Sequence, residues 1–322
     1  RSTLFPYTTL FRSTNFGAFS FFLRLRLGSF FAKLAGQEPH VSWAALVREH
    51  LLEYPVQKLR LLSGTDKRPL PEESVVRADD DFVVIRIDGH NIFWPADFPH
   101  DQIRSCYLSM RDDGPDNYFR FYTPQKDDVV FDLGACEGLF SLMLRGRVAK
   151  VYSFEPFPTL CTSLAMTLKE DVEGDRAEIC NYAVGDKTGE ADFYLDDDLD
   201  GSTMAGDRIG GGVKKITVPT ITLDEFVRAK GIEKISMIKM DIEGAEYSAL
   251  HGARETLARL RPDLLVCTYH YPHDYERISD FLRENGYTLT ASPLVMTPQG
   301  GGRPWYRHAL IYATPAGSGR TN

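Results

Sequence analysis

Residues 129–155 read VVFDLGACEGLFSLMLRGRVAKVYSFE, and the fold of the whole chain can be inferred outward from them. The run 129–133 is short, apolar except for Asp132, and rich in β-branched residues, which is typical of a central strand. Gly134 and Gly138 bracket the next turn, and apolar spacing over 139–144 predicts a short helix on a sheet. A second apolar run, 148–154, ends in Glu155. This strand, turn, helix, strand unit is of the kind that binds adenosine-type cofactors.

The turn itself discriminates between cofactors. A dinucleotide-binding turn has the form G-x-G-x-x-G, and its middle glycine lets the backbone approach a pyrophosphate. Here Cys136 stands at that position in the sequence GACEG, and a pyrophosphate would also face Glu137. S-adenosylmethionine has no phosphate and carries a cationic sulfonium, for which Asp132, the glycine backbone and Glu155 are suitable partners. The turn therefore predicts S-adenosylmethionine, although a glycine-punctuated corner also occurs in α/β proteins of other function.

Four more motifs follow in order: VYSFEP (151–156), NYAVGD (181–186), VPTITLDEF (218–226) and IKMDIEGAEYSALHGA (238–253). With the first stretch, this ordered set resembles the FkbM family of methyltransferases over about residues 127–313. The resemblance implies a class I S-adenosylmethionine-dependent methyltransferase that methylates an oxygen of a hydroxylated small molecule, a sugar, or a glycan or lipid head group.

The remaining sequence predicts an α/β fold: a Rossmann-like, seven-stranded, mostly parallel sheet with helices on both faces. Strands are expected at 178–182, 235–240 and 264–268, alternating with helices at 158–170, 223–230, 244–260 and 274–284. Residues 287–289 and 308–312 match the antiparallel pair that ends such methyltransferase sheets. Paired strands at 191–195 and 213–218 flank an acidic, glycine-rich loop, 196–212, which we expect to be a solvated lid rather than a calcium site.

Four regions are expected along the chain. Residues 1–13 resemble the translation of a common sequencing adapter and should lie outside the fold. Residues 14–125 form an N-terminal appendage, with a helix over 43–62, a hairpin over 82–94 around Asp88-Gly89, and a helix over 101–110. Residues 126–314 form the methyltransferase domain, and 315–322 a frayed tail. The aromatic residues Trp94, Tyr118 and Tyr122 either line an acceptor pocket or belong to the core.

The amino-acid composition limits the classes of partner and the location that we expect for the protein. The chain has 322 residues and a net charge of −8, which argues against a nucleic-acid surface because such a surface needs a basic stripe. Its five cysteines form no C-x-x-C pair, so we expect a reducing, cytoplasmic location. The segment 15–36 contains Arg24, Arg26 and Lys33 and is too interrupted to span a bilayer; a surface-bound amphipathic helix is the alternative to a docked one.

Polar residues at the predicted strand ends are expected to converge on one edge of the sheet. The residues expected to bind the cofactor are Asp132, Gly134, Ala135, Glu137, Gly138, Glu155, Pro156, Asn181 and Ala183. Each also has a structural interpretation. Asp241 and Glu243, for example, are placed to cap the next helix.

The candidate catalytic residues are Asp241, Glu243, Lys239 and His270. Many members of the family that the chain resembles carry an acid at the end of strand five, whereas this chain has Cys267-Thr268-Tyr269-His270, which favours His270 as a base. No metal is expected. The alternative is a hard metal ion held by Asp241, Glu243 and Asp274. For the whole chain, the alternative functions are a non-catalytic ligand-binding or scaffold domain and, less favoured, a nicotinamide oxidoreductase.

Overall fold

The structure is a computed structural model of the chain. It describes residues 73–77, 79–98, 103, 106, 107, 110, 117–195, 214–271, 273–292, 294–298 and 304–317. The chain divides into two compact units, one of Arg1–Leu70 with Pro293–Ala309 and one of Pro71–Ser292 with Leu310–Asn322. In the first unit, the described residues form an antiparallel hairpin of β13 (Leu294–Pro298) and β14 (Pro304–His308), which the sequence did not predict. All that follows concerns the second unit.

Several expectations lie outside the described residues: those for segments 1–13, 15–36, 43–62 and 196–212, and for the part 318–322 of the tail expected over 315–322. Pro315 is not frayed, because it pairs with Tyr287 as a strand residue. Of the helix expected over 101–110, the described residues Ile103, Cys106 and Tyr107 are helical. Within the described part of the chain, no helix has both the length and the apolar character that crossing a bilayer requires.

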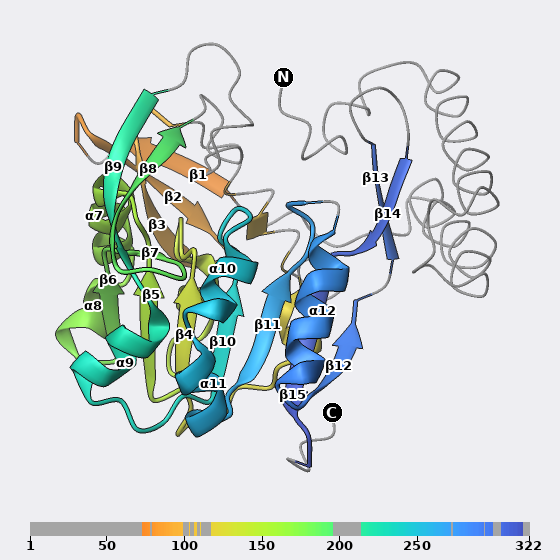
Figure 1. The fold of residues 1–322 in the computed structure, drawn as a ribbon. Coiled ribbons are helices and arrows are strands. Elements are labelled where there is room, and N and C mark those ends of the chain that lie inside the picture. Colours follow the sequence, from red (N-terminus) through yellow and green to blue (C-terminus); the bar gives the residue numbers. More distant parts are fainter. Residues whose placement is uncertain are drawn as a thin grey trace. The chain divides into compact units, whose positions relative to one another are not determined.

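The central sheet has seven strands in the order β12-β15-β11-β10-β4-β5-β6 (Figure 1). Their bounds are β4 (Val129–Leu133), β5 (Lys150–Phe154), β6 (Ala177–Cys180), β10 (Met237–Met240), β11 (Asp263–Cys267), β12 (Tyr287–Ala291) and β15 (Leu310–Pro315). All neighbouring pairs are parallel except those of β15, which runs antiparallel to β11 and β12. This is the predicted mostly parallel sheet with its terminal antiparallel pair.

The helices are η3 (Tyr118–Arg120), α6 (Leu139–Met143), α7 (Pro158–Thr167), α8 (Lys169–Glu173), α9 (Leu223–Lys230), α10 (Glu246–His251), α11 (Arg254–Leu260) and α12 (Asp274–Glu284). Apolar residues of α9 to α12 pack on one face of the sheet, where Phe226, Leu250 and Phe281 join a single core with Phe131 and Ile238 of the central strands. The strands are buried because both faces are covered, which is why their sequences are nearly continuous in apolar residues.

The helix predicted over 244–260 is wrong in one respect, because it is broken into α10 and α11 at Gly252. A Cβ on Gly252 would lie 2.1 Å from the carbonyl oxygen of Gly185, and the carbonyl of Gly252 accepts the amide of Asp224 at 3.0 Å. Backbone from two other segments therefore approaches this position, and the helical hydrogen bonds give way to contacts with it.

Two smaller sheets complete the unit. The predicted hairpin is confirmed as β2 (Phe82–Ile87) and β3 (His90–Pro95), with positive φ at Asp88 (50°) and Gly89 (78°), and β1 (Glu73–Arg77) adds a third strand. The amide of Phe93 in β3 donates to Thr167 Oγ1 of α7 at 3.0 Å, and the hydroxyl of Ser163 donates to the Phe93 carbonyl. The second sheet has the order β7 (Ala183–Val184), β9 (Lys214–Ile221), β8 (Gly189–Leu195), and it contains the strand pair predicted around the acidic loop.

Candidate active site

A glycine turn joins β4 to α6 at the carboxyl edge of the central sheet. The amides of Gly134 and Ala135 donate to the carbonyl oxygen of Phe154 at 3.0 and 2.9 Å, which fastens the turn to β5. Gly134 has φ +77°, and a Cβ there would lie 1.8 Å from the carbonyl oxygen of Asp241. Gly138 has φ +80°, and a Cβ there would lie 2.4 Å from Cδ1 of Leu164 in α7. The positive φ favours glycine at both positions, and at Gly134 the adjacent backbone also leaves no space for a side chain.

Glu155 follows β5 and faces this turn. Its Oε2 accepts the amide of Cys136 and its Oε1 the amide of Phe157, both at 3.0 Å. The side chain is almost completely buried, and burial raises the pKa of Glu155 to about 7, although the two amides and Lys239 act in the opposite direction. A buried carboxylate of this kind, at the end of the second strand, is a natural acceptor for ligand hydroxyls.

The other residues expected to bind the cofactor surround Glu155. The side-chain amide of Asn181 donates to the carbonyl oxygens of Glu155 and Pro156, each at 2.9 Å, and so fixes the segment after β5. Ala183 is buried in β7. Glu137 is half-buried in the glycine turn, where burial raises its pKa despite the opposing effect of its own backbone hydrogen bond and of Lys239.

A buried ion pair links the glycine turn to the centre of the sheet. Lys239 of β10 lies 3.0 Å from Oδ1 of Asp132 in the adjacent β4, and its Nζ donates to the carbonyl of Gly134 at 2.7 Å. Asp132 also accepts the hydroxyl of Ser141 at 2.7 Å and is fully buried. Burial alone would lower the pKa of Lys239, but Asp132 and Asp241 raise it above its usual value. The pair therefore lies beneath the turn and holds its backbone.

Asp241 follows β10 directly and is held by two phenols. Tyr118 donates to Oδ2 at 2.9 Å, and Tyr269 lies 2.8 and 2.9 Å from the two carboxylate oxygens. Burial would raise the pKa of Asp241, but Lys239, His270 and the phenols together lower it. About a fifth of the side chain is exposed, so an ionised carboxylate of fixed orientation faces outward.

His270 lies behind Asp241, with a completely buried side chain. Its Nδ1 is 3.0 Å from Oε1 of Glu246, and its Nε2 is 3.5 Å from Oδ1 of Asp241 and 3.6 Å from Oε2 of Glu243. Burial would lower the pKa of His270, but Glu246 and Glu243 raise it well above its usual value. The surrounding carboxylates favour the protonated form of the imidazole, which was not foreseen when His270 was predicted as a base.

Glu243 is the most exposed carboxylate of this cluster, with a third of its side chain accessible. It adopts φ +55° and is followed by Gly244 at φ +99°, so the chain turns sharply between β10 and α10. Burial raises the pKa of Glu243, and His270 opposes this shift. A non-glycine residue in the left-handed region costs conformational energy and is often found at functional sites.

The structure adds residues that sequence reasoning did not select. Glu246 lies within the quoted motif, one helical turn after Glu243, and Tyr269 is adjacent to His270; both had a detectable signal in the sequence. Of the three aromatic residues considered as pocket-lining, Tyr118 reaches Asp241, whereas Trp94 and Tyr122 are core residues.

Two groups of side chains have the donor atoms and spacing that a metal ion would need. In one, Asp241, Glu243 and His270 offer atoms that all lie within 4.8 Å of one another; in the other, Glu246, His270 and Asp274 do so. Asp274 is therefore not part of a set with Asp241 and Glu243, as the metal alternative supposed. It accepts the amide of Tyr271 at 2.7 Å instead.

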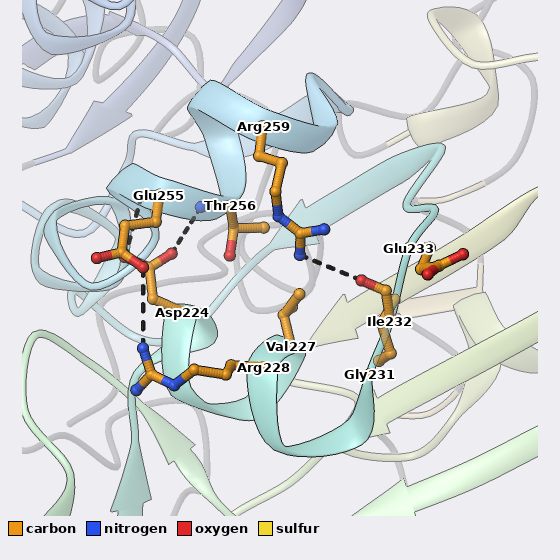
Figure 2. A pocket seen from close by; sticks show the side chains of 9 residues that line it. All are labelled: Asp224, Val227, Arg228, Gly231, Ile232, Glu233, Glu255, Thr256 and Arg259. Atoms are coloured by element: carbon orange, nitrogen blue, oxygen red, sulfur yellow. Dashed lines mark hydrogen bonds and ion pairs between the residues drawn. The ribbon is translucent and has the colours of Figure 1, made fainter.

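A separate pocket of about 310 Å³ lies between α9 and α11 (Figure 2). Asp224 accepts the amides of Glu255 and Thr256 at the start of α11, and Arg259 donates to the carbonyl of Ile232 at 3.2 Å. The lining contains none of the residues predicted for the site, and Asp224, Arg228, Glu255 and Arg259 are occupied in joining α11 to α9 and to the loop after it.

Comparison with known proteins identifies the segment that carries this site. Residues 132–289 match the family described as the methyltransferase FkbM domain. This range includes the glycine turn, Glu155, and the cluster around His270. It confirms the resemblance seen in the ordered motifs.

Similar proteins include the 2-O-methyltransferase NoeI of Sinorhizobium fredii (strain NBRC 101917 / NGR234), which is 29% identical over 42% of this chain and 61% of its own length. The hexuronic acid methyltransferase AglP of Haloferax volcanii is 24% identical over 50% of this chain and 63% of its own length. The chain thus spans less than two thirds of either relative. Among solved structures, methyltransferase FkbM from Methylobacillus flagellatus KT is 18% identical, with a TM-score of 0.41, and the match covers 67% of this chain and 55% of that one.

Proposed function

We propose that this chain, which belongs to the methyltransferase FkbM domain family, methylates a hydroxyl group with S-adenosylmethionine as the donor. The observation that carries the proposal is the cluster of Asp241, Glu243 and His270 beside the glycine turn, at the carboxyl edge of the sheet. Ligands of open α/β sheets bind at this edge. In this proposal, the glycine turn holds the cofactor and the neighbouring carboxylates accept the proton of the acceptor hydroxyl.

The residues around the turn fit S-adenosylmethionine. Each oxygen of Glu155 accepts one backbone amide and retains a lone pair for a ribose hydroxyl. The partly exposed carboxylates of Asp241 and Glu243 favour a cationic sulfonium over a pyrophosphate. When bound, the cofactor supplies an electrophilic methyl group. The protein's residues then have to orient the acceptor oxygen and take its proton.

Asp241 is suited to hold the acceptor. Its carboxylate is ionised, partly exposed and fixed by Tyr118 and Tyr269, so it offers a hydrogen-bond acceptor in one orientation. Methyl transfer is an in-line displacement, and correct placement of the two reactants alone can supply about 7 to 11 kcal/mol.

Glu243 is the better candidate for the proton acceptor. Its raised pKa lies nearer to the working pH than that of Asp241, and a base is most effective when its pKa approaches that pH. It is also more exposed than Asp241. A positioned base contributes about a hundred- to ten-thousandfold in rate.

In our proposal, His270 and Lys239 act from buried positions behind Asp241 and Glu243. The protonated imidazole balances the charges of Asp241 and Glu243, whereas Lys239 balances Asp132 and holds the turn. With these cations in place, the mechanism works without a metal ion.

For the acceptor, we propose a neutral hydroxylated small molecule, sugar, or glycan or lipid head group. The names of the two relatives describe a 2-O-methyltransferase and a hexuronic acid methyltransferase; both support a sugar-like acceptor, and the first supports methylation at oxygen. Hexuronic acids are anionic, so on the charge of the acceptor our proposal differs from the second relative's name. In the described part of the chain, the groups near Asp241 include more carboxylates than cations, and this disfavours an anionic acceptor.

The experiment is transfer of a labelled methyl group from S-adenosylmethionine to a panel of neutral and anionic hydroxylated acceptors, read by mass spectrometry. We expect a methyl ether on a neutral acceptor with the wild-type protein and loss of most product with Glu243→Gln. The exposed Glu190→Gln is the matched control. Methylation at nitrogen or carbon, or full activity of Glu243→Gln, would overturn the proposal.

A further inference from the structure

Glu246 is the innermost carboxylate of the cluster, and the reaction proposed above does not use it. It is the first residue of α10, and its side chain is completely buried. Its Oε1 accepts the amide of Ile242 at 2.8 Å and lies 3.0 Å from Nδ1 of His270. One oxygen atom therefore joins the turn after β10 to the imidazole after β11.

We infer that Glu246 is a positioning residue for methyl transfer, which holds His270 by Nδ1 so that Nε2 faces Asp241 and Glu243. This inference rests on the proposed function. A carboxylate that accepts the Nδ1 proton fixes the orientation of the ring and stabilises its charged form. The two carboxylates that face outward thus depend on a third that no acceptor reaches.

The backbone explains why the residue at position 246 can do this. Positive φ at Glu243 and Gly244 turns the chain back so that α10 starts directly beneath the end of β10. A Cβ on Gly244 would lie 2.3 Å from the ring of Tyr271, so the turn is also confined from the side of β11. The glutamate is thereby brought back to the amide of Ile242, four residues earlier.

Other charged groups near His270 have partners of their own. Asp274 of α12 is paired with Arg277, whose Nε lies 3.0 Å away, and Tyr269 donates to Asp241. The titratable groups that face His270 from the elements around it are Asp241, Glu243, Glu246, Asp274 and Tyr269. Of the three carboxylates Asp241, Glu243 and Glu246, which lie 3.5, 3.6 and 3.0 Å from a ring nitrogen, Glu246 is the nearest.

Glu246→Gln separates charge from structure, because both contacts of Glu246 use Oε1. The amide oxygen of glutamine can still accept from Ile242 and from His270, but it no longer carries the negative charge that stabilises the imidazolium. Glu246→Asp keeps the negative charge, but its shorter side chain places the carboxylate farther from the imidazole ring. The control is Glu284→Gln, which removes one carboxylate from an exposed position at the end of α12.

Two measurements test the inference. The first is the pH profile of kcat: with Glu246→Gln we expect kcat to fall about ten- to a hundredfold, the range typical when a carboxylate that orients a functional histidine is lost. The loss should grow with rising pH, because the weakened imidazolium deprotonates earlier, while KM for S-adenosylmethionine stays unchanged. Glu246→Asp should recover part of the rate, and Glu284→Gln should match the wild type.

The second measurement follows the ring nitrogens of His270 by NMR, with His270→Asn for assignment among the eight histidines. We expect imidazolium signals throughout the neutral range in the wild type and a titration at lower pH in Glu246→Gln. A loss of kcat that is equal at every pH, or an unchanged His270 titration, would overturn the inference. Because NMR needs no turnover, it still decides the role of Glu246 if no methyl acceptor is found, an outcome that counts only against the proposed function.

Discussion

Gly134 and Asp241 are in such close contact that a side chain on the glycine would overlap the carbonyl oxygen of the aspartate at 1.8 Å. The two residues follow adjacent strands, β4 and β10, and the amide of Asp241 donates to the carbonyl of Leu133 at 3.1 Å. The turn proposed for the cofactor and the acid proposed for the acceptor are therefore parts of one packed corner. A change on one side of this corner must affect the other.

Gly134→Ala should accordingly be damaging. The closest comparison is Gly89→Ala, because Gly89 has nearly the same φ, +78° against +77°, but no atom within 4 Å of the added Cβ. We expect Gly89→Ala to lower the free energy of unfolding by about 1 to 2 kcal/mol through backbone strain alone. Gly134→Ala should cost at least about 3 kcal/mol because overlap adds to strain. Urea unfolding measures both, and equal losses would contradict the close approach.

Binding of S-adenosylhomocysteine should depend on pH through Glu155. Because the pKa of this buried carboxyl is about 7, it is increasingly protonated below that pH and then accepts ribose hydroxyls poorly. Calorimetry should show affinity falling by about tenfold per pH unit below pH 7. Glu155→Gln should weaken binding by about 2 kcal/mol or more at pH 8 and abolish this pH dependence. If the wild-type affinity is constant between pH 5.5 and 8, Glu155 is not in the cofactor site.

The same carboxyl has a defined effect on folding. Its pKa is raised from 4.5 to about 7, so its contribution to the stability of the free protein is complete below pH 4.5 and is lost as the pH rises through 7. In the wild type, this carboxyl should make the free energy of unfolding fall as the pH rises from 4.5 to 7, and Glu155→Gln should remove that fall. Thermal unfolding measured across this pH range tests the prediction, with Glu190→Gln as the control.

Replacing Asp241 by asparagine should abolish most turnover and leave cofactor binding nearly intact. His270→Ala should have the same effect, because it removes the cation that faces both exposed carboxylates. Tyr269→Phe removes one of the two phenols on Asp241 and should lower kcat by about tenfold, as expected for a lost hydrogen bond to a charged group. Wild-type rates in both Asp241→Asn and His270→Ala would refute this assignment of the catalytic residues.

Lys239 and Asp132 should be coupled in stability. Lys239→Met leaves a fully buried carboxylate without its cation, and we expect a loss of about 3 to 5 kcal/mol in the free energy of unfolding. The double variant with Asp132→Asn should lose less than the sum of the two single variants. A double-mutant cycle in urea measures this difference, and strictly additive losses would show that the two residues act independently.

A chelator should leave turnover unchanged. Asp241, Glu243 and His270 are spaced closely enough for a metal ion, so the question is worth an experiment. In our interpretation, the proton on His270 supplies the positive charge at this position. Loss of activity with EDTA and its recovery with magnesium or manganese would show that a metal ion, and not that proton, supplies the positive charge.

Much of the fold could be predicted because local sequence and tertiary structure agree. The strands β4, β10 and β11 are apolar apart from one charged residue each. The helix α9 is preceded by Thr222, whose hydroxyl accepts the amide of Glu225 as an N-cap. The bounds predicted for α9 and α12 coincide with the structure. The break at Gly252 could not be predicted, because it depends on backbone from residues 185 and 224.

The position of the candidate site could be predicted from strand ends, but its electrostatics could not. Asp241 and His270 each follow a strand, and parallel topology brings them to one edge. The hydrogen bond from Tyr118 to Asp241 joins residues 123 positions apart, which no local pattern reveals. The charge state of His270 depends on three carboxylates whose distances are set by the turn at Glu243, and this required the structure.

The hydrogen bonds between α7 and β3 also bear on aggregation. β3 is an edge strand, and edge strands offer unpaired amides and carbonyls to strands of other molecules. At Phe93 both groups are occupied, the amide by Thr167 and the carbonyl by Ser163. Two hydroxyls of α7 thus occupy the backbone groups to which another strand would bind at Phe93. Intermolecular β-pairing along this part of the edge is therefore blocked by the protein's own helix.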